Sequence, residues 1–85
     1  MDKHEKLLQR ILSGRQDTSI RFSEVVLLLK VLGFSLRIKS SHYIFFREGI
    51  EEIINIQPDG SKAKPYQVKQ IRRLIFKYKL EAKDV

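Results

Sequence analysis

The sequence predicts one small α+β domain, in which helices cover one face of a three-stranded antiparallel sheet and leave the other face open. The main signal is the spacing of apolar residues, which is helical near both ends of the chain and alternating between them. With 85 residues the chain is too short for two hydrophobic cores. Its 42% hydrophobic residues suffice for one core and differ from the composition of a disordered chain. We therefore expect a single domain over residues 1–85, with an N-terminal helical extension (1–21) and a core (22–79).

The first helix is expected over residues 3–12, with its end near Gly14. Its apolar stripe consists of Leu7, Leu8, Ile11 and Leu12. The polar segment SGRQDTS then predicts a loop.

The second helix has clearer boundaries. Ser23 is the expected N-cap, and Phe22 and Leu27 stand at the two positions of a hydrophobic staple. Gly33 ends the helix in a left-handed conformation, which lets Phe34 pack back on the last turn. The buried face consists of Val25, Leu28, Leu29 and Leu32.

Three strands follow, because the apolar period changes from helical to alternating. They are expected over residues 36–39, 42–46 and 53–56. The pair Ser40 and Ser41 predicts a tight turn between the first two strands, and residues 47–51 predict a second turn. Strands joined in this way form an antiparallel meander.

The last helix is expected to begin at Pro65, because proline suits the first helical position, and a Pro-Asp-Gly turn precedes it. Its apolar stripe consists of Val68, Ile71, Leu74, Ile75 and Tyr78. The basic residues Lys69, Arg72, Arg73 and Lys77 are expected to point mainly toward solvent.

The charge of the chain indicates a polyanionic partner. The formal net charge is +7, and residues 61–79 hold most of the basic excess. The absence of cysteine excludes disulfide scaffolds, thiolate zinc sites and thiol nucleophiles, and favours a reducing compartment. The N-terminus has mixed charge, unlike a signal peptide, and no apolar run reaches the length of a membrane span. We expect a soluble cytoplasmic protein that needs no metal and no cofactor.

The sequence offers few groups for catalysis. His4 lies among charged neighbours in a terminal helix, and we interpret it as a solvated side chain. We interpret the acidic residues beside the second turn as solvated too; they are Glu48, Glu51 and Glu52.

His42 is the remaining candidate, at the start of the second strand. Strand alternation puts it on the face opposite Tyr43 and Phe45. If those two aromatic residues pack under the helices, His42 projects from the open face near Arg37 and Lys39. Periodicity alone leaves open which face is buried.

Two blocks of the chain resemble the HicA family of toxins from prokaryotic toxin–antitoxin pairs. Residues 22–47, FSEVVLLLKVLGFSLRIKSSHYIFFR, are similar to the family's helix ending in Leu-Gly-Phe, its strand, and its Gly-Ser-His motif before an aromatic strand. Residues 54–75, INIQPDGSKAKPYQVKQIRRLI, resemble the family's C-terminal signature. Residues 1–21 look like the N-terminal extension of a HicA subgroup.

The resemblance implies a fold similar to the double-stranded-RNA-binding domain, and an mRNA-cleaving endoribonuclease (mRNA interferase) inhibited by a HicB-type antitoxin. It implies mRNA and that antitoxin as partners, and no DNA contact by this chain alone. The motif histidine, His42 here, is the catalytic residue of the family. Ser40 departs from the motif glycine. If its position requires a positive φ, the turn is strained by roughly 1–2 kcal/mol, and the activity is expected to be affected more than the fold.

Metal-independent RNA cleavage requires proton transfers, which an imidazole performs near neutral pH, and cations that offset phosphate charge. The candidates for RNA contact are Arg37, Lys39, Ser41, Lys62 and Lys64, although ordinary solvated charges explain the basic ones equally well. Ser41 either orients His42 or caps the turn. Tyr66 is either a second proton-transfer group or a packing residue.

Two other functions fit the same residues. The first is an RNA-binding module without catalysis, which would bind RNA in a salt-sensitive way and release no cleavage products. The second is a protein-interaction module whose open sheet face is covered by a partner chain.

Overall fold

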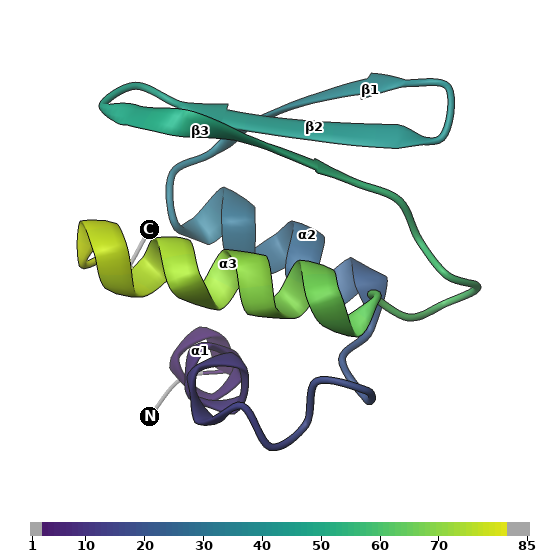
Figure 1. Cartoon of the computed structure of the whole chain (residues 1–85), viewed down its shortest axis with the longest axis vertical. Helices are drawn as coiled ribbons and strands as arrows, with labels where there is room; N and C mark the ends of the chain where they lie inside the picture. Colours follow the sequence, from purple (N-terminus) through teal and green to yellow (C-terminus); the bar gives the residue numbers. More distant parts are fainter. Residues whose placement is uncertain (1–2, 82–85) are drawn as a thin grey trace.

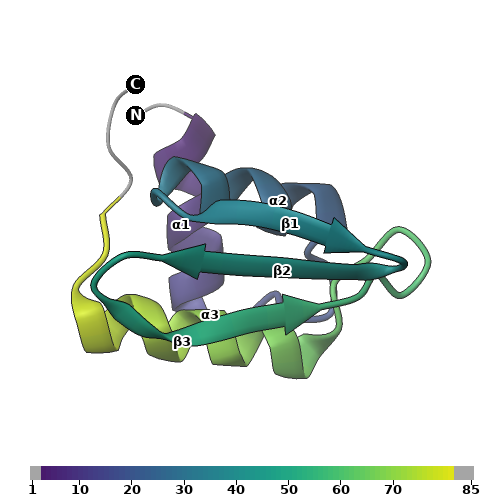
Figure 2. The ribbon, with the colours of Figure 1, turned by 90° about the horizontal axis from the view of Figure 1, so that it is seen from above.

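A three-stranded sheet lies on two successive layers of helix (Figure 1). The computed structural model describes residues 3–81. Its elements are α1 (Lys3–Ser13), α2 (Phe22–Val31), β1 (Ser35–Lys39), β2 (His42–Arg47), β3 (Ile50–Ile56) and α3 (Pro65–Tyr78). Helices α2 and α3 lie side by side under the sheet, and α1 crosses them on the side away from it (Figures 1 and 2). This confirms the predicted α+β fold with one sheet face open, and adds α1 as an outer layer.

The sheet is an antiparallel meander in the order β1-β2-β3. Phe45 in β2 is fully buried, and the ring of Tyr43 packs edge-on against Phe22 of α2 with their centroids 4.8 Å apart. These two aromatic residues therefore face the helices. The alternation then places His42 on the open face, which answers the question that periodicity left open.

One hydrophobic cluster joins the sheet to all three helices. Its largest fully buried side chains come from the sheet, the three helices and the loop before α2, and they are Phe45, Ile54, Ile56, Val25, Leu28, Leu29, Val68, Ile71, Ile11 and Ile20. Leu7 and Ile11 of α1 belong to this cluster, so α1 shares the core of the other elements. Among residues 3–81, no helix combines the length and apolarity required to cross a membrane.

The start of α2 corrects the predicted cap. The N-cap is Arg21 and not Ser23, and the carboxylate of Glu24 accepts a hydrogen bond from the Arg21 backbone N–H at 3.0 Å. Leu27 is 39% exposed, so the predicted staple is also wrong. With the helix starting earlier, Ile20 and Val25 occupy the staple positions, and both are fully buried. The helix therefore starts where Ile20 can be buried, and not where Ser23 would cap it.

The end of α2 agrees with the prediction. Gly33 has a φ of 93°, and the Phe34 N–H donates to the carbonyl oxygen of Leu29 at 2.9 Å. The second hairpin, between β2 and β3, is tighter than predicted, because Arg47 already pairs with Ile50 and only two residues form the turn. Gly49, with a φ of 88°, permits this sharp reversal. Strand β3 therefore begins at Ile50, three residues before the predicted start.

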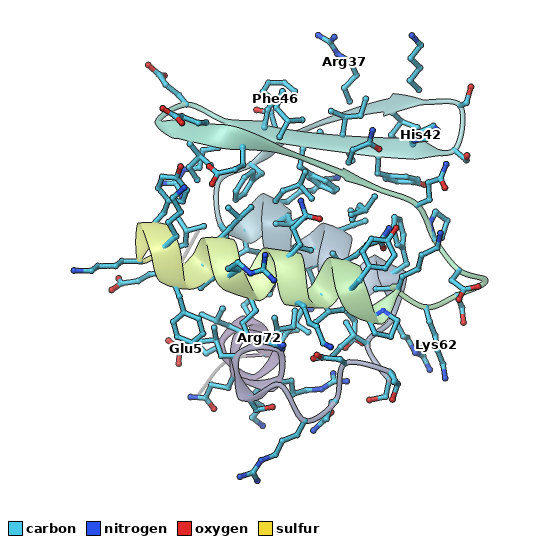
Figure 3. All side chains as sticks on the ribbon, in the orientation of Figure 1. Glu5, Arg37, His42, Phe46, Lys62 and Arg72 are labelled. Carbon is cyan, nitrogen blue, oxygen red and sulfur yellow. The ribbon has the colours of Figure 1, made fainter. Side chains whose placement is uncertain are left out.

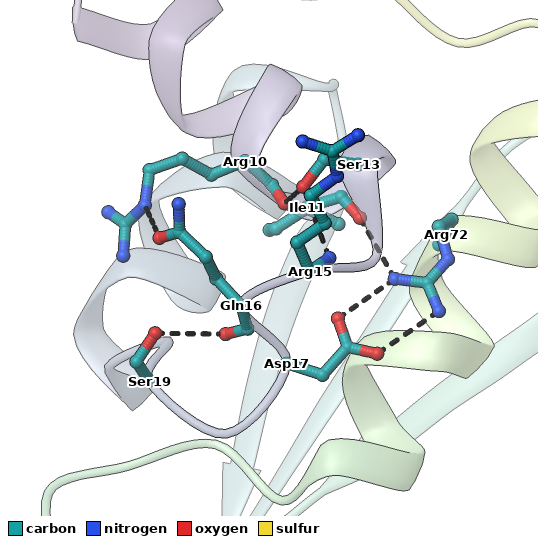
Figure 4. Close-up of polar contacts among 8 residues, drawn as sticks. All are labelled: Arg10, Ile11, Ser13, Arg15, Gln16, Asp17, Ser19 and Arg72. Carbon is teal, nitrogen blue, oxygen red and sulfur yellow. Dashed lines mark hydrogen bonds and ion pairs between the residues drawn. The ribbon is translucent and has the colours of Figure 1, made fainter.

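Helix α3 begins at Pro65 as predicted, but one of its basic side chains, Arg72, is not mainly solvated. The guanidinium of Arg72 binds both carboxylate oxygens of Asp17 at 2.9 and 3.1 Å and the carbonyl of Ile11 at 2.9 Å (Figure 4). Lys77 donates to Glu52 at 2.7 Å. The prediction for Arg72 fails because its partners come from segments far away in the sequence, whereas Lys77 is exposed as expected. Lys69 and Arg73 are exposed, as expected.

The interpretation of Glu52 as a solvated carboxylate is wrong for the same reason. It accepts hydrogen bonds from Lys77 and from the hydroxyl of Tyr78, the latter at 2.5 Å. The hydrogen bond from Lys77, followed by that from Tyr78, lowers the pKa of Glu52 to about 2. These contacts tie β3 to the last turn of α3.

Candidate nucleic-acid site around His42

His42 is the first residue of β2 and lies at one end of the sheet (Figure 3). Its side chain is exposed, and Lys39 is its direct neighbour across the β1–β2 ladder. Between these two residues the chain reverses through Ser40 and Ser41 alone. The imidazole is therefore accessible from solvent at a fixed corner of the fold.

Two amide side chains of β3 and its end contact the ring. The Nδ1 atom of His42 lies 3.2 Å from Oδ1 of Asn55. The amide nitrogen of Gln57 lies 3.0 Å from Nε2 and 3.4 Å from Nδ1 of the same ring. An atom in line with the Nε2 lone pair would be much farther from Nδ1 than from Nε2. The Gln57 amide consequently lies over the face of the ring, where its N–H contacts the π system.

The ring forms one wall of a hollow of about 230 Å³ between the sheet end and the start of α3. Its lining residues are His42, Asn55, Gln57, Tyr66 and Gln67. Tyr66 is 62% exposed, which does not fit the packing role considered for it. The structure thus brings the tyrosine and the histidine, 24 positions apart in the printed sequence, to the same hollow.

Gln67 is a buried residue that lines this hollow. It was not among the residues predicted for the site. Its side chain is buried, and its amide pairs with the backbone of Gln57, donating to the carbonyl oxygen at 3.2 Å and accepting from the N–H at 3.1 Å. This pairing fixes the residue whose side chain covers His42. A signal for it existed, because Gln67 is four residues before Ile71 and continues the buried stripe of α3.

The turn before His42 has the conformation that the motif glycine suggested. Ser40 has a φ of 56°, in the left-handed region, whereas Ser41 does not. A positive φ at the first turn position alone is typical of a type II′ turn, which prefers glycine there. Ser40 is therefore strained, as expected for a serine that replaces the motif glycine at a position with positive φ.

The four basic candidates for RNA contact fall into two groups. Lys39 and Arg37 lie on the open side of the sheet, where Arg37 points away from the helices (Figure 3). Lys62 lies at the level of the helices, and Lys64 is the N-cap of α3 (Figure 3). Within residues 3–81 these four cations form no ion pair. His42 lies between the levels of Arg37 and Lys62 (Figure 3), so the four cations do not form one flat platform.

Ser41, the fifth candidate, contacts Gln57 and not His42. Its hydroxyl oxygen accepts a hydrogen bond from the Gln57 amide at 3.3 Å. It therefore restrains the side chain that covers the ring, and any effect on His42 passes through Gln57.

The open sheet face also has an apolar part. Ile44, Phe46 and Ile53 line a shallow groove of about 320 Å³ together with Arg37, and Ile53 is 61% exposed. Strand alternation puts Ile44 and Phe46 on the face of His42, and the register of β3 adds Ile53 to them.

Among residues 3–81, no three His, Asp or Glu side chains gather into a set that could hold a metal ion. Comparisons of the chain with family models, curated proteins and solved structures gave no match. The likeness to HicA toxins therefore rests on the motifs in residues 22–47 and 54–75.

Proposed function

We propose that this chain is a HicA-like toxin, a metal-independent endoribonuclease that cleaves mRNA in the cytoplasm and is inhibited by a HicB-type antitoxin. We also propose that residues 22–79 have a fold similar to the double-stranded-RNA-binding domain. The observation that carries the proposal is the accessible imidazole of His42 in a hollow that it shares with Tyr66. The two motif blocks add independent support.

The chemistry follows from the two titratable side chains that line the hollow, His42 and Tyr66. Nε2 of His42 accepts the proton of a ribose 2′-hydroxyl, and the 2′-oxygen then attacks the adjacent phosphorus. The bond to the 5′-oxygen breaks, and that oxygen takes up a proton from the phenol of Tyr66 or from water. The products carry a 2′,3′-cyclic phosphate and a 5′-hydroxyl, so the atoms and charges balance.

Cations near the hollow are expected to hold the RNA and offset the charge of the pentavalent phosphorus. Lys39 is directly across the strand from His42, and Lys64 lies two residues before Tyr66. Because neither forms an ion pair within residues 3–81, both are available for phosphate.

The test is cleavage of a model RNA by the purified protein in the presence of EDTA, with wild type beside His42→Ala. The variant is expected to lose at least about 100-fold in rate, which is the usual contribution of a general acid or base. Its unfolding midpoint should not change, because the ring is exposed. His4→Ala is the matched control and should cleave like wild type. Undiminished cleavage by His42→Ala would contradict the mechanism.

A second candidate function is favoured by the apolar groove on the open sheet face. Exposed apolar side chains such as Phe46 and Ile53 beside Arg37 suit contact with another protein. A chain of this kind would form a tight complex with a neighbour-encoded protein and would neither bind nor cut RNA. Salt-sensitive RNA binding without products would instead indicate an RNA-binding module.

A further inference from the structure

We infer that Asn55 is a positioning residue, which holds neutral His42 as the Nδ1–H tautomer so that its Nε2 lone pair faces the substrate. The catalytic meaning of this tautomer rests on the proposed nuclease function. The tautomer itself is a property of the free protein, and it is measurable without RNA.

The first argument is the chemistry of the contact between Asn55 and the ring. The carbonyl oxygen of an asparagine side chain only accepts hydrogen bonds, so the Nδ1 atom 3.2 Å away has to donate. In a neutral imidazole one nitrogen carries the proton and the other keeps a lone pair. The contact with Asn55 therefore assigns the proton to Nδ1 and the lone pair to Nε2.

The second argument concerns the direction of that lone pair. The Gln57 amide lies over the ring face, at 3.0 Å from Nε2 and 3.4 Å from Nδ1. It does not lie on the Nε2 lone-pair axis, which runs in the plane of the ring. Gln57 thus limits rotation of the imidazole and leaves the lone pair accessible from the hollow.

The third argument is that both amides are held in place. Asn55 belongs to β3, where it pairs with Ile44 of β2. Gln57 is fixed through its backbone by the buried Gln67 and through its side chain by Ser41. A catalytic group restrained from several elements needs less reorganisation when the substrate binds. Asn55 and His42 are both exposed, so this arrangement contributes little to the core.

The deciding experiment is ¹⁵N NMR of the histidine rings in the full-length free protein, at a pH above the titration of the rings. The signals of His42 are assigned by their loss in His42→Ala. Wild type is expected to have Nδ1 protonated as the major form, and Asn55→Ala is expected to shift the majority to Nε2–H. Asn55→Asp keeps an acceptor at the same place and should restore Nδ1–H. A major Nε2–H form in wild type, or an unchanged ratio in Asn55→Ala, would overturn the inference.

The cleavage assay separates positioning from a structural role. Asn55→Ala is expected to lower kcat at least about tenfold with little change in KM, since the RNA still binds but the base is misoriented. Asn55→Asp should recover most of kcat, and the unfolding midpoint of Asn55→Ala should equal that of wild type. Equal kcat values for wild type and Asn55→Ala would contradict the positioning role. If wild type cleaves no RNA, the nuclease proposal fails while the tautomer ratio still tests the role of Asn55.

Discussion

Basic side chains form ion pairs on the helical side of this protein, whereas those near His42 form none within residues 3–81. On the helical side, Arg72 binds Asp17 of the loop after α1 (Figure 4), and Arg10 of α1 binds Glu24 of α2 at 2.7 Å. Both pairs fasten α1 and its following loop to the other helices. At the end of the sheet, Lys39 pairs with His42 across the strands and Lys64 is the N-cap of α3, and neither forms an ion pair within residues 3–81. Part of the basic excess is therefore neutralised within the fold, and only the remainder is available to the proposed RNA partner.

The distribution of carboxylates explains this contrast. Asp17 and Glu24 belong to the first 24 residues, where acidic and basic residues nearly balance, and they neutralise cations that come within reach in the fold. Glu52 has the same role for Lys77 at the far end of α3. No such carboxylate forms an ion pair with Arg37, Lys39, Lys62 or Lys64 in the part of the chain from 3 to 81.

The largest expected effect on stability is at the helical side. Arg72→Ala leaves the carboxylate of Asp17 and the carbonyl of Ile11 without their partner, and the pair is mostly buried, with 19% and 10% of the two side chains exposed. We expect a loss of about 2–3 kcal/mol in urea unfolding. The exposed neighbour Arg73→Ala should cost less than about 0.5 kcal/mol. Similar losses in the two variants would mean that the ion pair does not hold α1.

The second prediction concerns RNA affinity at the sheet end. Lys39→Ala with Lys64→Ala should weaken RNA binding about tenfold or more at low salt and reduce the slope of log affinity against log salt by about two. Lys69→Ala with Arg73→Ala removes the same charge from an exposed part of α3 and should leave the slope nearly unchanged. Fluorescence anisotropy with a labelled RNA at several salt concentrations measures both. Equal losses would show that total charge matters and position does not.

A smaller effect, of opposite sign, is expected in the turn before His42. Ser40→Gly relieves a residue with a φ of 56°, so it should stabilise the protein by about 0.5–1 kcal/mol after the added freedom of the unfolded chain. Ser41→Gly should destabilise it by a similar amount, because Ser41 is outside the positive-φ region and binds Gln57. Thermal unfolding of both variants compares them directly. The same sign for both would refute the strain at Ser40.

The smallest effect is the acid dependence of the Glu52 contacts. The pKa of Glu52 is lowered from 4.5 to about 2, chiefly by the hydrogen bond from Lys77. This contribution to stability is complete above the ordinary value and is lost as the pH falls toward about 2. Unfolding midpoints across this range should decline less steeply for Glu52→Gln than for wild type, whereas Glu51→Gln should follow wild type. Parallel curves of unfolding midpoint against pH for all three proteins would contradict a stabilising role of the Glu52 contacts.

Local patterns in the sequence predicted most of the fold, and distant contacts explain what they missed. Gly33, Pro65 and the apolar spacing set the helix ends and strands through short-range chemistry. The face of His42 depends on packing between Tyr43 and Phe22, which no alternation pattern contains.

The candidate site was predictable only in part for the same reason. His42 and its turn were identified from neighbouring residues, but the ring contacts come from Asn55 and Gln57, 13 and 15 positions away. Which of their atoms meet the ring depends on the register of β2 and β3. The buried side chain of Gln67 depends in addition on where α3 docks.

The most direct test of the account is the chemical identity of the RNA ends. Wild type in EDTA is expected to produce a 2′,3′-cyclic phosphate and a 5′-hydroxyl, detected by mass spectrometry, and to leave the same RNA intact when the cleaved nucleotide lacks its 2′-hydroxyl. His42→Ala should give neither product. Ends bearing a 3′-hydroxyl and a 5′-phosphate, or cleavage of the 2′-deoxy substrate, would contradict a proton transfer from the ribose to His42.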